Sequence, residues 1–266
     1  MELGLEGKVA MVTGAGGGIG AAIARTFCQE HATTIFVDID EKGLKRAVKG
    51  YEGYGNYVTC DVSKYANVRQ LFSDIKERFG TLHILVNNAA LNTADYIVDL
   101  KEDDINRIVD VNIKGYIHTT MEALPLMREA GFGRLIYINS SSGLKASAGL
   151  SLYSSSKYFN RGFAIAAALE EGRHNITSNS INPSDVYPEG DMEARSWKNE
   201  ALLRISLEKE NVKSLEEFIK KRNNSNPMRR SCKKEDVAWL ALFLASEKAG
   251  FINGQSIGVN GGAIPY

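Results

Sequence analysis

The sequence carries no excess of charge of either sign, because its 32 basic and 32 acidic residues cancel. A neutral chain without a long basic run argues against nucleic acid as the main partner. The sequence also lacks an apolar run approaching the roughly 20 residues needed to span a bilayer, and its N-terminus, M-E-L-G-L-E-G-K, lacks the pattern of a secretory signal. We therefore expect a soluble cytoplasmic protein that binds neither nucleic acid nor a membrane.

Cysteine and histidine are scarce as well. The three cysteines, Cys28, Cys60 and Cys232, are odd in number and widely spaced. Such a set fits reduced thiols of a cytosolic protein better than a disulfide framework or a zinc site. Cys60 ends an apolar stretch and is expected in the core. The four histidines show no ligand spacing, so we expect no metal.

Internal repeats and low-complexity linkers are absent, and what is present is an alternation of short β-rich stretches with longer helical ones. The expected strands are Val9–Thr13, Thr34–Asp38, Asn56–Cys60, Ile84–Asn87, Arg134–Asn139, Asn175–Asn182 and Gln255–Val259. The expected helices include Ile19–Glu30, Val68–Phe79, Asp103–Met127, Tyr153–Gly172 and Lys234–Ala245. Strands that are apolar without alternation are typical of a sheet covered on both faces. The pattern predicts an α/β fold with a doubly wound parallel sheet of about seven strands.

One segment interrupts this alternation. Residues 187–226 are charged and helix-prone, with W-K-N-E-A-L-L-R-I-S-L-E and S-L-E-E-F-I-K-K-R as the clearest stretches. We expect a helical insertion, or lid, before the last helix and strand. The chain length of 266 residues suits one domain, spanning 1–266, that includes this insertion.

A strand, a glycine-rich turn and a helix follow one another at the N-terminus, in the order of a Rossmann-type dinucleotide site. Glycines at 14, 18 and 20 would let the backbone approach a pyrophosphate at the helix N-terminus, although such a turn can also be merely structural. Asp38 ends the second strand, where a carboxylate can accept hydrogen bonds from the adenosine ribose and repels a 2′-phosphate. Lys42 is the nearest cation. The sequence therefore favours NAD over NADP.

Tyr153 and Lys157 are four residues apart and would share one face of a helix. An ammonium beside a phenol, together with a nearby cofactor, can lower the phenol pKa from about 10 towards the working pH. Ser140 lies thirteen residues before Tyr153. Alone, such a pair is common on helix surfaces, so its meaning depends on the other motifs.

Taken in order, these motifs resemble the short-chain dehydrogenase/reductase family over nearly the whole chain. The resemblance is carried by T-G-x-x-x-G-x-G at Thr13–Gly20, N-N-A at 87–89, V-N-I-K-G around Asn112, I-N-S-S-S-G at 138–143, and the Tyr-Lys pair. Spacing to Tyr153 selects Ser140 over Ser141 and Ser142. The resemblance implies that Tyr153 moves the proton, Lys157 holds the nicotinamide ribose, Ser140 donates to the substrate oxygen, and Asn112 kinks its helix and holds a water.

The resemblance also implies a set of cofactor-binding residues. They are Thr13, Gly14, Gly18, Ile19, Gly20, Asp38, Asp61, Val62, Asn88, Ala89, Tyr153, Lys157, Pro183 and Val186. For Asp61, a local cap before Ser63 stays open as an alternative. The chain departs from the family pattern at Ala90, Ser184, Pro188 and Asn260, where the family commonly has Gly, Gly, Thr and Asp.

The substrate is expected at the carboxyl ends of the strands, beside the insertion. The candidate lining residues are Asn92, Thr93, Asp95, Ser142, Lys145, Tyr187, Glu189 and Trp197. These polar groups favour a polyol, sugar or sugar phosphate. Lys145, Arg195 and Lys198 would suit a phosphate, whereas Glu189 and Asp191 would oppose it.

The tail of the chain is similar to sorbitol-6-phosphate 2-dehydrogenases and to the dehydrogenase modules fused to rhamnulose-phosphate aldolases. We therefore expect an NAD-dependent enzyme that oxidises or reduces such a substrate. A 3-oxoacyl thioester reductase, a hydroxysteroid dehydrogenase and a cofactor-binding regulator without turnover are the alternatives. The family resemblance further implies a homotetramer that pairs the helices at Asp103–Met127 and Tyr153–Gly172.

Overall fold

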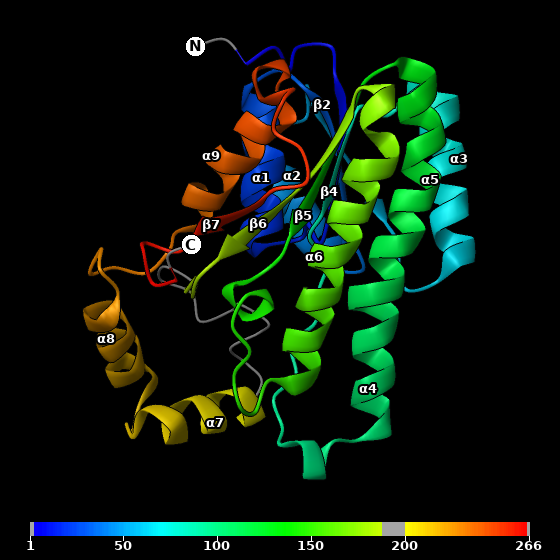
Figure 1. Ribbon diagram of the computed structural model, residues 1–266. Helices are drawn as coiled ribbons and strands as arrows, with labels where there is room; N and C mark the ends of the chain where they lie inside the picture. Colours follow the sequence, from blue (N-terminus) through cyan, green and yellow to red (C-terminus); the bar gives the residue numbers. More distant parts are fainter. Residues whose placement is uncertain (1–2, 188–199, 265–266) are drawn as a thin grey trace.

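The computed structural model describes residues 3–187 and 200–264. Seven parallel strands form one sheet in the order β3-β2-β1-β4-β5-β6-β7 (Figure 1). Their bounds are β1 Val9–Thr13, β2 Thr33–Asp38, β3 Gly55–Thr59, β4 Ile84–Asn87, β5 Gly133–Ile138, β6 Ile176–Pro183 and β7 Ser256–Val259. The chain runs outward from β1 to β3 and then returns to the other side of β1 at β4. This reversal opens a crevice at the carboxyl ends of β1 and β4, where doubly wound sheets bind their ligands.

Helices cover both faces of the sheet (Figure 1). One face carries α1 Gly18–Gln29, α2 Glu41–Val48 and α9 Lys234–Ala245, and the other carries α3 Tyr65–Phe79, α5 Gly115–Ala130 and α6 Ser151–Glu171. Successive strand residues alternate between the two layers, so that Val12 packs with the first group and Met11 with the second. In the described ranges, no helix has both the length and the apolar character required to cross a bilayer.

The predicted strands agree with the structure to within two residues, and the predicted α/β fold with a doubly wound parallel sheet is confirmed. The helix expected at Asp103–Met127 is different in detail. It consists of α4 Glu102–Ile108, a π-helical turn at Val109–Lys114, and α5. A π turn inserts one extra residue into the hydrogen-bond ladder, which the periodicity of side chains does not reveal. The sequence also missed α2, which is short and mostly polar.

The insertion contributes two helices between β6 and α9, α7 Glu200–Glu210 and α8 Leu215–Ser225, near the carboxyl ends of the strands (Figure 1). The start of the predicted insertion, residues 188–199, lies outside the described residues. Leu202 and Ile205 of α7 pack with Ala94 and Leu150, which belong to loops at this edge of the sheet. The α7 helix is therefore anchored to the body of the domain by apolar contacts.

The three cysteines are buried free thiols. Burial raises the pKa of both Cys28 and Cys60 to about 11, so neither is a thiolate at neutral pH. Cys60 lies in the core layer that includes α3, as the sequence predicted. These cysteines are packing residues rather than reactive groups.

An ion pair between α5 and α6 gives a prediction about stability. The guanidinium of Arg128 contacts both carboxylate oxygens of Glu171, whose side chain is only 1% exposed. Arg128→Met should leave the buried Glu171 carboxylate without its cation and lower the free energy of unfolding more than the loss of an exposed ion pair does. Urea unfolding at neutral pH measures this change.

The pH dependence of the same change has a definite sign. Arg128 lowers the pKa of Glu171 below its ordinary value of 4.5, so the pair stabilises the protein above that pH and the benefit is lost as pH falls. The difference between Arg128→Met and the original protein should therefore shrink in acid. Lys76→Met is the matched control, because it breaks the exposed Lys76–Glu129 pair and should change the free energy of unfolding by less than about 0.5 kcal/mol. Equal effects of the two variants would contradict this account.

Candidate functional site

The glycine turn between β1 and α1 has a backbone that requires glycine. Gly14 and Gly18 have φ angles of +66° and +55°, in the left-handed region. A Cβ at Gly20 would lie 2.3 Å from the carbonyl oxygen of Gly14 and 2.5 Å from the side-chain amide of Asn88. The turn therefore closes tightly on itself, and three of the sequence-predicted glycines are fixed by sterics.

Thr13 and Asn88 tie this turn to the loop after β4. The hydroxyl oxygen of Thr13 accepts hydrogen bonds from the backbone N–H groups of Asn88 (2.9 Å) and Ala89 (3.1 Å). The Asn88 side chain donates to the carbonyl oxygens of Thr13 (2.9 Å) and Gly14 (3.1 Å). Two motifs that are 75 residues apart in sequence thus form one rigid edge of the crevice. Ala90, which replaces the family's glycine, has no positive φ and needs no glycine.

The first turn of α1 is suited to a pyrophosphate. Gly17 is its N-cap, and within the described chain no side chain caps its N–H groups and no acidic residue lies in the first turn. Cβ atoms built at Gly17 and Gly18 would meet no atom within 4 Å, so the space in front of these N–H groups is open. Ile19, half-buried, packs against the core behind them. Unpaired helix N–H donors facing open space attract an anion.

Asp38 ends β2 beside the same turn. One carboxylate oxygen accepts the backbone N–H of Gly16 at 3.0 Å, and the other accepts the backbone N–H of Asp40 at 2.9 Å. These bonds hold the carboxylate beside the glycine turn. A negative charge held here disfavours a second phosphate.

Asp61 and Val62 follow β3, and the structure shows what each contacts. The Asp61 carboxylate accepts the backbone N–H of Ser63 at 3.0 Å, which is the local turn that the sequence left open as an alternative. Val62 is buried against Gly115, and its carbonyl oxygen lies 3.2 Å from a ring nitrogen of His118. The loop after β3 is thus packed onto α5, and an adenine contact by Asp61 stays a prediction.

Asn112 lies in the π-helical turn at Val109–Lys114 and is fully buried. Its side-chain oxygen accepts the backbone N–H of Leu91 at 2.8 Å, while its amide donates to the Leu91 carbonyl at 2.9 Å and to the Ser156 hydroxyl at 3.1 Å. Both amide donors are therefore used to join the loop after β4 to α6. The family resemblance implied that Asn112 kinks its helix and holds a water; the structure has a π-helical turn there, and the water-holding role stays a prediction.

Ser140 and Tyr153 meet at the carboxyl end of β5. Ser140 follows β5 and starts a short 3-10 turn at Ser141–Gly143, where its hydroxyl oxygen accepts the backbone N–H of Ser142 at 3.0 Å. Tyr153 lies in the first turn of α6. A hydrogen bond from Ser140 lowers the pKa of Tyr153, which places the two hydroxyls together. The sequence spacing that selected Ser140 is consistent with this arrangement.

Lys157 lies one turn after Tyr153, with its ammonium 5.6 Å from the centre of the Tyr153 ring. The ammonium donates to the carbonyl oxygen of Ile138 at 2.8 Å and to the hydroxyl of Tyr116 at 3.4 Å. Lys157 is 2% exposed, and this burial lowers its pKa to about 7. The shared helix face predicted for the Tyr-Lys pair is therefore present.

The lowered pKa expected for Tyr153 is not produced by the protein groups alone. The sequence predicts a lowered value, but burial raises the pKa of Tyr153, the Ser140 hydrogen bond lowers it by less, and the charge of Asp185 raises it further. Lys157 does not reverse this balance, because its own burial removes part of its charge near neutral pH. The expectation includes a nearby cofactor, so a lowered pKa of Tyr153 stays a prediction for the protein with its cofactor bound.

The loop after β6 forms the next wall of the crevice. Pro183 ends β6, the backbone N–H of Ser184 bonds to the carbonyl of Val259 at 3.1 Å, and Val186 forms a parallel bridge to Cys232. Ser184, at a family glycine position, is thus held in the sheet by its backbone. Pro188, the other departure on this wall, lies outside the described residues.

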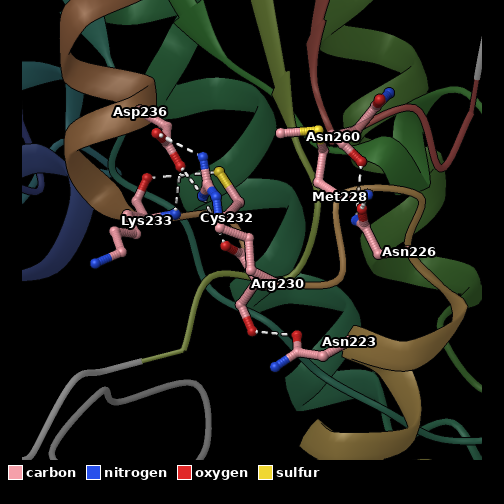
Figure 2. A network of polar contacts seen from close by, with 9 residues as sticks. Asn223, Asn226, Met228, Arg230, Cys232, Lys233, Asp236 and Asn260 are labelled. Carbon is pink, nitrogen blue, oxygen red and sulfur yellow. Dashed lines mark hydrogen bonds and ion pairs between the residues drawn. The ribbon is translucent and has the colours of Figure 1, made fainter.

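The segment that carries Cys232 is itself fixed by polar contacts (Figure 2). Arg230 pairs with Asp236 at the start of α9, and the Asn226 amide donates to the carbonyl oxygen of Asn260 at 3.1 Å. Asn260 replaces the family's Asp in the late V-D-G-G motif. The network joins α8, α9 and the end of β7, and it supports the loop after β6 from behind.

An ion pair that the sequence did not predict joins this wall to the insertion. The Arg222 guanidinium of α8 donates to the Asp185 carboxylate at 2.8 Å and lies 3.5 Å from Glu210 of α7. The Tyr187 ring packs edge-on against Phe218 of α8. Asp185 and Arg222 are 37 residues apart, and the charged character of residues 187–226 was the one signal that pointed to Arg222.

The remaining candidate substrate residues are partly described. Asn92, Thr93 and Ser142 are half-buried at the strand ends, Lys145 is exposed, and Tyr187 is half-buried against α8. Asp95 lies 3.9 Å from Arg204 of α7. Glu189, Asp191, Arg195, Trp197 and Lys198 lie outside the described residues. Among the described residues, no group of His, Cys, Asp and Glu side chains is arranged to hold a metal.

The chain matches known proteins over nearly its full length. Residues 8–199 match the family model described as short chain dehydrogenase, and residues 204–263 match the one described as Enoyl-(Acyl carrier protein) reductase. The chain is 30% identical over 264 residues to the 3-oxoacyl-[acyl-carrier-protein] reductase of Thermotoga maritima, covering 98% of this chain and 99% of that one. It is 37% identical over 260 residues to a short-chain dehydrogenase reductase of Arabidopsis thaliana, covering 96% and 92%.

Among solved structures, the fold matches an NAD⁺-bound xylitol dehydrogenase with a TM-score of 0.86 at 25% identity, covering 96% of this chain and 98% of that one. The names of these proteins refer to different substrates. They therefore agree on the fold and on the class of chemistry, and they leave the substrate of this chain open.

Proposed function

Because the chain belongs to the short-chain dehydrogenase/reductase family, we propose that it interconverts a secondary alcohol and a ketone with NAD(H), acting on a polyol, sugar or sugar phosphate. The observation that carries the proposal is the meeting of Ser140, Tyr153 and Lys157 at the sheet edge that also bears the glycine turn. Membership of the family makes the chain an oxidoreductase.

The protein groups at the crevice fit NAD(H). The open, uncapped N-terminus of α1 would hold the pyrophosphate, and Asp38 would accept hydrogen bonds from the adenosine ribose. The xylitol dehydrogenase of the same fold was solved with NAD⁺. A titration should show NADH bound at least tenfold more tightly than NADPH, since the Asp38 charge repels a 2′-phosphate. Equal or tighter binding of NADPH would remove this part of the proposal.

When bound, the nicotinamide supplies the acceptor or donor of the hydride. In oxidation, the Tyr153 oxygen accepts the proton of the substrate hydroxyl, and in reduction it returns that proton to the carbonyl oxygen. Ser140 donates its hydroxyl to the same substrate oxygen while its lone pair holds the Ser142 N–H. Lys157 presents its charge beside Tyr153 and favours the phenolate.

Polar groups around the crevice support a hydroxylated substrate. Asp185, Asn92 and Thr93 offer hydrogen-bonding groups at the strand ends, and Arg222 keeps the Asp185 carboxylate compensated. The structural similarity to a xylitol dehydrogenase agrees with a polyol. The similarity to a 3-oxoacyl-[acyl-carrier-protein] reductase over 98% of the chain favours a second candidate, reduction of a 3-oxoacyl thioester.

A substrate screen separates these two candidates. NAD⁺ reduction is followed by absorbance across polyols, sugars and their phosphates, and NADH oxidation across 3-oxoacyl thioesters and ketosteroids. We expect the largest kcat/KM for a polyol, sugar or sugar phosphate. Turnover of acyl thioesters or steroids without turnover of polyols would replace the first candidate by the second.

A glycine substitution tests the cofactor site, with a glycine outside the turn as its control. Gly20→Ala places a methyl group 2.3 Å from the Gly14 carbonyl and against Asn88, so it should weaken NADH binding at least about tenfold and destabilise the protein by about 1–3 kcal/mol. Gly53→Ala is the control, because a Cβ there meets no atom within 4 Å, its φ is not positive, and it lies just before β3, outside the glycine turn. It should leave NADH affinity and thermal stability nearly unchanged. Fluorescence titration and thermal unfolding measure both variants.

We extend the proposal to the assembly and location of the protein. Met121 of α5 and Leu169 of α6 are 50% and 82% exposed, and apolar side chains gathered on these two helices support pairing in a homotetramer. Light scattering should give four times the chain mass of 29.2 kDa, and a monomer would contradict this. Three buried free thiols suit the reducing cytoplasm.

A further inference from the structure

The ammonium of Lys157 is held from outside its own helix by two oxygen atoms. One is the carbonyl of Ile138 at the end of β5, at 2.8 Å, and the other is the hydroxyl of Tyr116 on α5, at 3.4 Å. The Tyr116 ring centre lies 5.4 Å from the same ammonium. Three elements, β5, α5 and α6, therefore meet at this one charge.

The geometry of Tyr116 defines what its hydroxyl does. Tyr116 is 1% exposed and follows the π-helical turn that contains Asn112. Its hydroxyl donates to the Ile138 carbonyl at 3.1 Å, which uses its one hydrogen. The lone pairs of the oxygen are left to accept from Lys157.

No described carboxylate compensates this ammonium at close range. The titratable groups that face it are Tyr153 from α6 and Tyr116 from α5, with Tyr137 of β5 behind Tyr116. Asp185, the nearest acidic group in the site, acts on Tyr153. Burial alone lowers the pKa of Lys157 to about 7, so neutral oxygens decide how much charge it keeps near neutral pH.

We propose that Tyr116 is a positioning residue that keeps Lys157 charged and directed at Tyr153. The hydroxyl of Tyr116 and the carbonyl of Ile138 accept from two of the three ammonium donors. The inference rests on the proposed function, because the charge of Lys157 matters for proton transfer by Tyr153. It adds a residue that none of the sequence motifs includes.

Tyr116→Phe removes the oxygen and keeps the ring, and Tyr137→Phe is the matched control. Tyr137 is also fully buried, its ring lies 6.0 Å from that of Tyr116, and its hydroxyl bonds to Thr120 at 3.0 Å instead of to Lys157. Both variants lose one buried hydroxyl, so both should lose similar thermal stability. A difference between their pH profiles of kcat/KM for oxidation therefore reports on Lys157.

With NAD⁺ bound, where the positive nicotinamide favours the Tyr153 phenolate, Tyr116→Phe should narrow the pH profile of oxidation from both sides. Without the Tyr116 oxygen, Lys157 loses its proton more easily, so the alkaline limb should move down by about one pH unit. With less positive charge beside it, Tyr153 holds its proton more tightly, so the acid limb should move up. Each limb reflects the titration of the coupled Tyr153–Lys157 pair rather than of one residue alone. The maximum of kcat/KM should fall about tenfold. Tyr137→Phe should keep both limbs in place.

Unchanged limbs of the pH profile in Tyr116→Phe, or the same narrowing of the profile in Tyr137→Phe, would overturn the proposal.

Carbon-13 NMR of tyrosine labelled at Cζ gives a test in the unmutated protein that does not depend on turnover. The Tyr116 signal, assigned through its contacts with Ile138, should move as Lys157 titrates, and Lys157→Met should abolish that movement. A Tyr116 signal that stays constant through this range overturns the proposal. If no alcohol is oxidised by the unmutated protein, the proposed function fails while this NMR result still decides the role of Tyr116.

Discussion

Tyr153→Phe should lower kcat/KM for alcohol oxidation by about a thousandfold or more, while the protein stays folded. The phenol oxygen is the proposed proton acceptor, and proton transfer by a positioned side chain contributes about 10²–10⁴-fold. The ring is kept, so its packing beside Ser140 and Lys157 should persist. Steady-state kinetics, thermal unfolding and NADH titration measure the three consequences.

Tyr158→Phe is the matched control for this change. Tyr158 lies on the same helix, 43% exposed, and its hydroxyl donates to the Leu144 carbonyl at 2.7 Å. Its loss should change kcat/KM less than about threefold and should leave NADH affinity unchanged. If Tyr153→Phe kept most of its activity while still binding NADH, another group would carry the proton and the proposed mechanism would be wrong.

The architecture was predictable because its strands are buried on both faces. Val9–Thr13 is buried at every position, and its apolar run has no polar alternation, which excludes a sheet with one solvated face. The α2 helix at Glu41–Val48 escaped because its apolar face is limited to a few residues around Leu44. Periodicity did not reveal the π turn within Asp103–Met127, because it changes hydrogen bonding without changing composition; only the family resemblance indicated a kink at Asn112.

The site was predictable where its residues lie close together in the chain and was missed where folding brings distant ones together. The motif of Ser140, Tyr153 and Lys157 can be recognised in the sequence because the spacings between these residues are short. The contact of Tyr116 with Lys157 spans 41 residues, and a buried aromatic in an apolar helix is indistinguishable in sequence from a packing residue. The Ile138 carbonyl carries no sequence signal at all, since every residue has one.

The pKa of Tyr153 shows a second limit of sequence reasoning. Spacing indicated that a cation stands beside the phenol, and it does. The sign of the shift depends on burial, which acts on both members of the pair in the direction that opposes charge. Because burial opposes the charge of both Tyr153 and Lys157, neighbouring hydrogen bonds have a large influence on their titration.

Ser140→Ala should lower kcat about a hundredfold, which is the magnitude of removing one donor to a developing oxyanion. It also tests how a neighbouring hydrogen bond changes the titration of Tyr153. The hydrogen bond of Ser140 lowers the pKa of Tyr153, so its removal should raise that pKa. Because oxidation requires the phenolate, the acid limb of the pH profile should move to higher pH. Kinetics of oxidation measured across pH test both effects.

Ser141→Ala is the control that tests the choice among three consecutive serines. Ser141 lies in the adjoining 3-10 turn, where its backbone carbonyl accepts from Lys145, and this bond does not involve its side chain. It should keep kcat within about threefold and leave the acid limb unchanged. A larger loss in Ser141→Ala than in Ser140→Ala would mean that the spacing to Tyr153 selected the wrong serine. The order of the two effects, rather than their size, decides the assignment, because a general loss of stability in the turn would affect both variants alike.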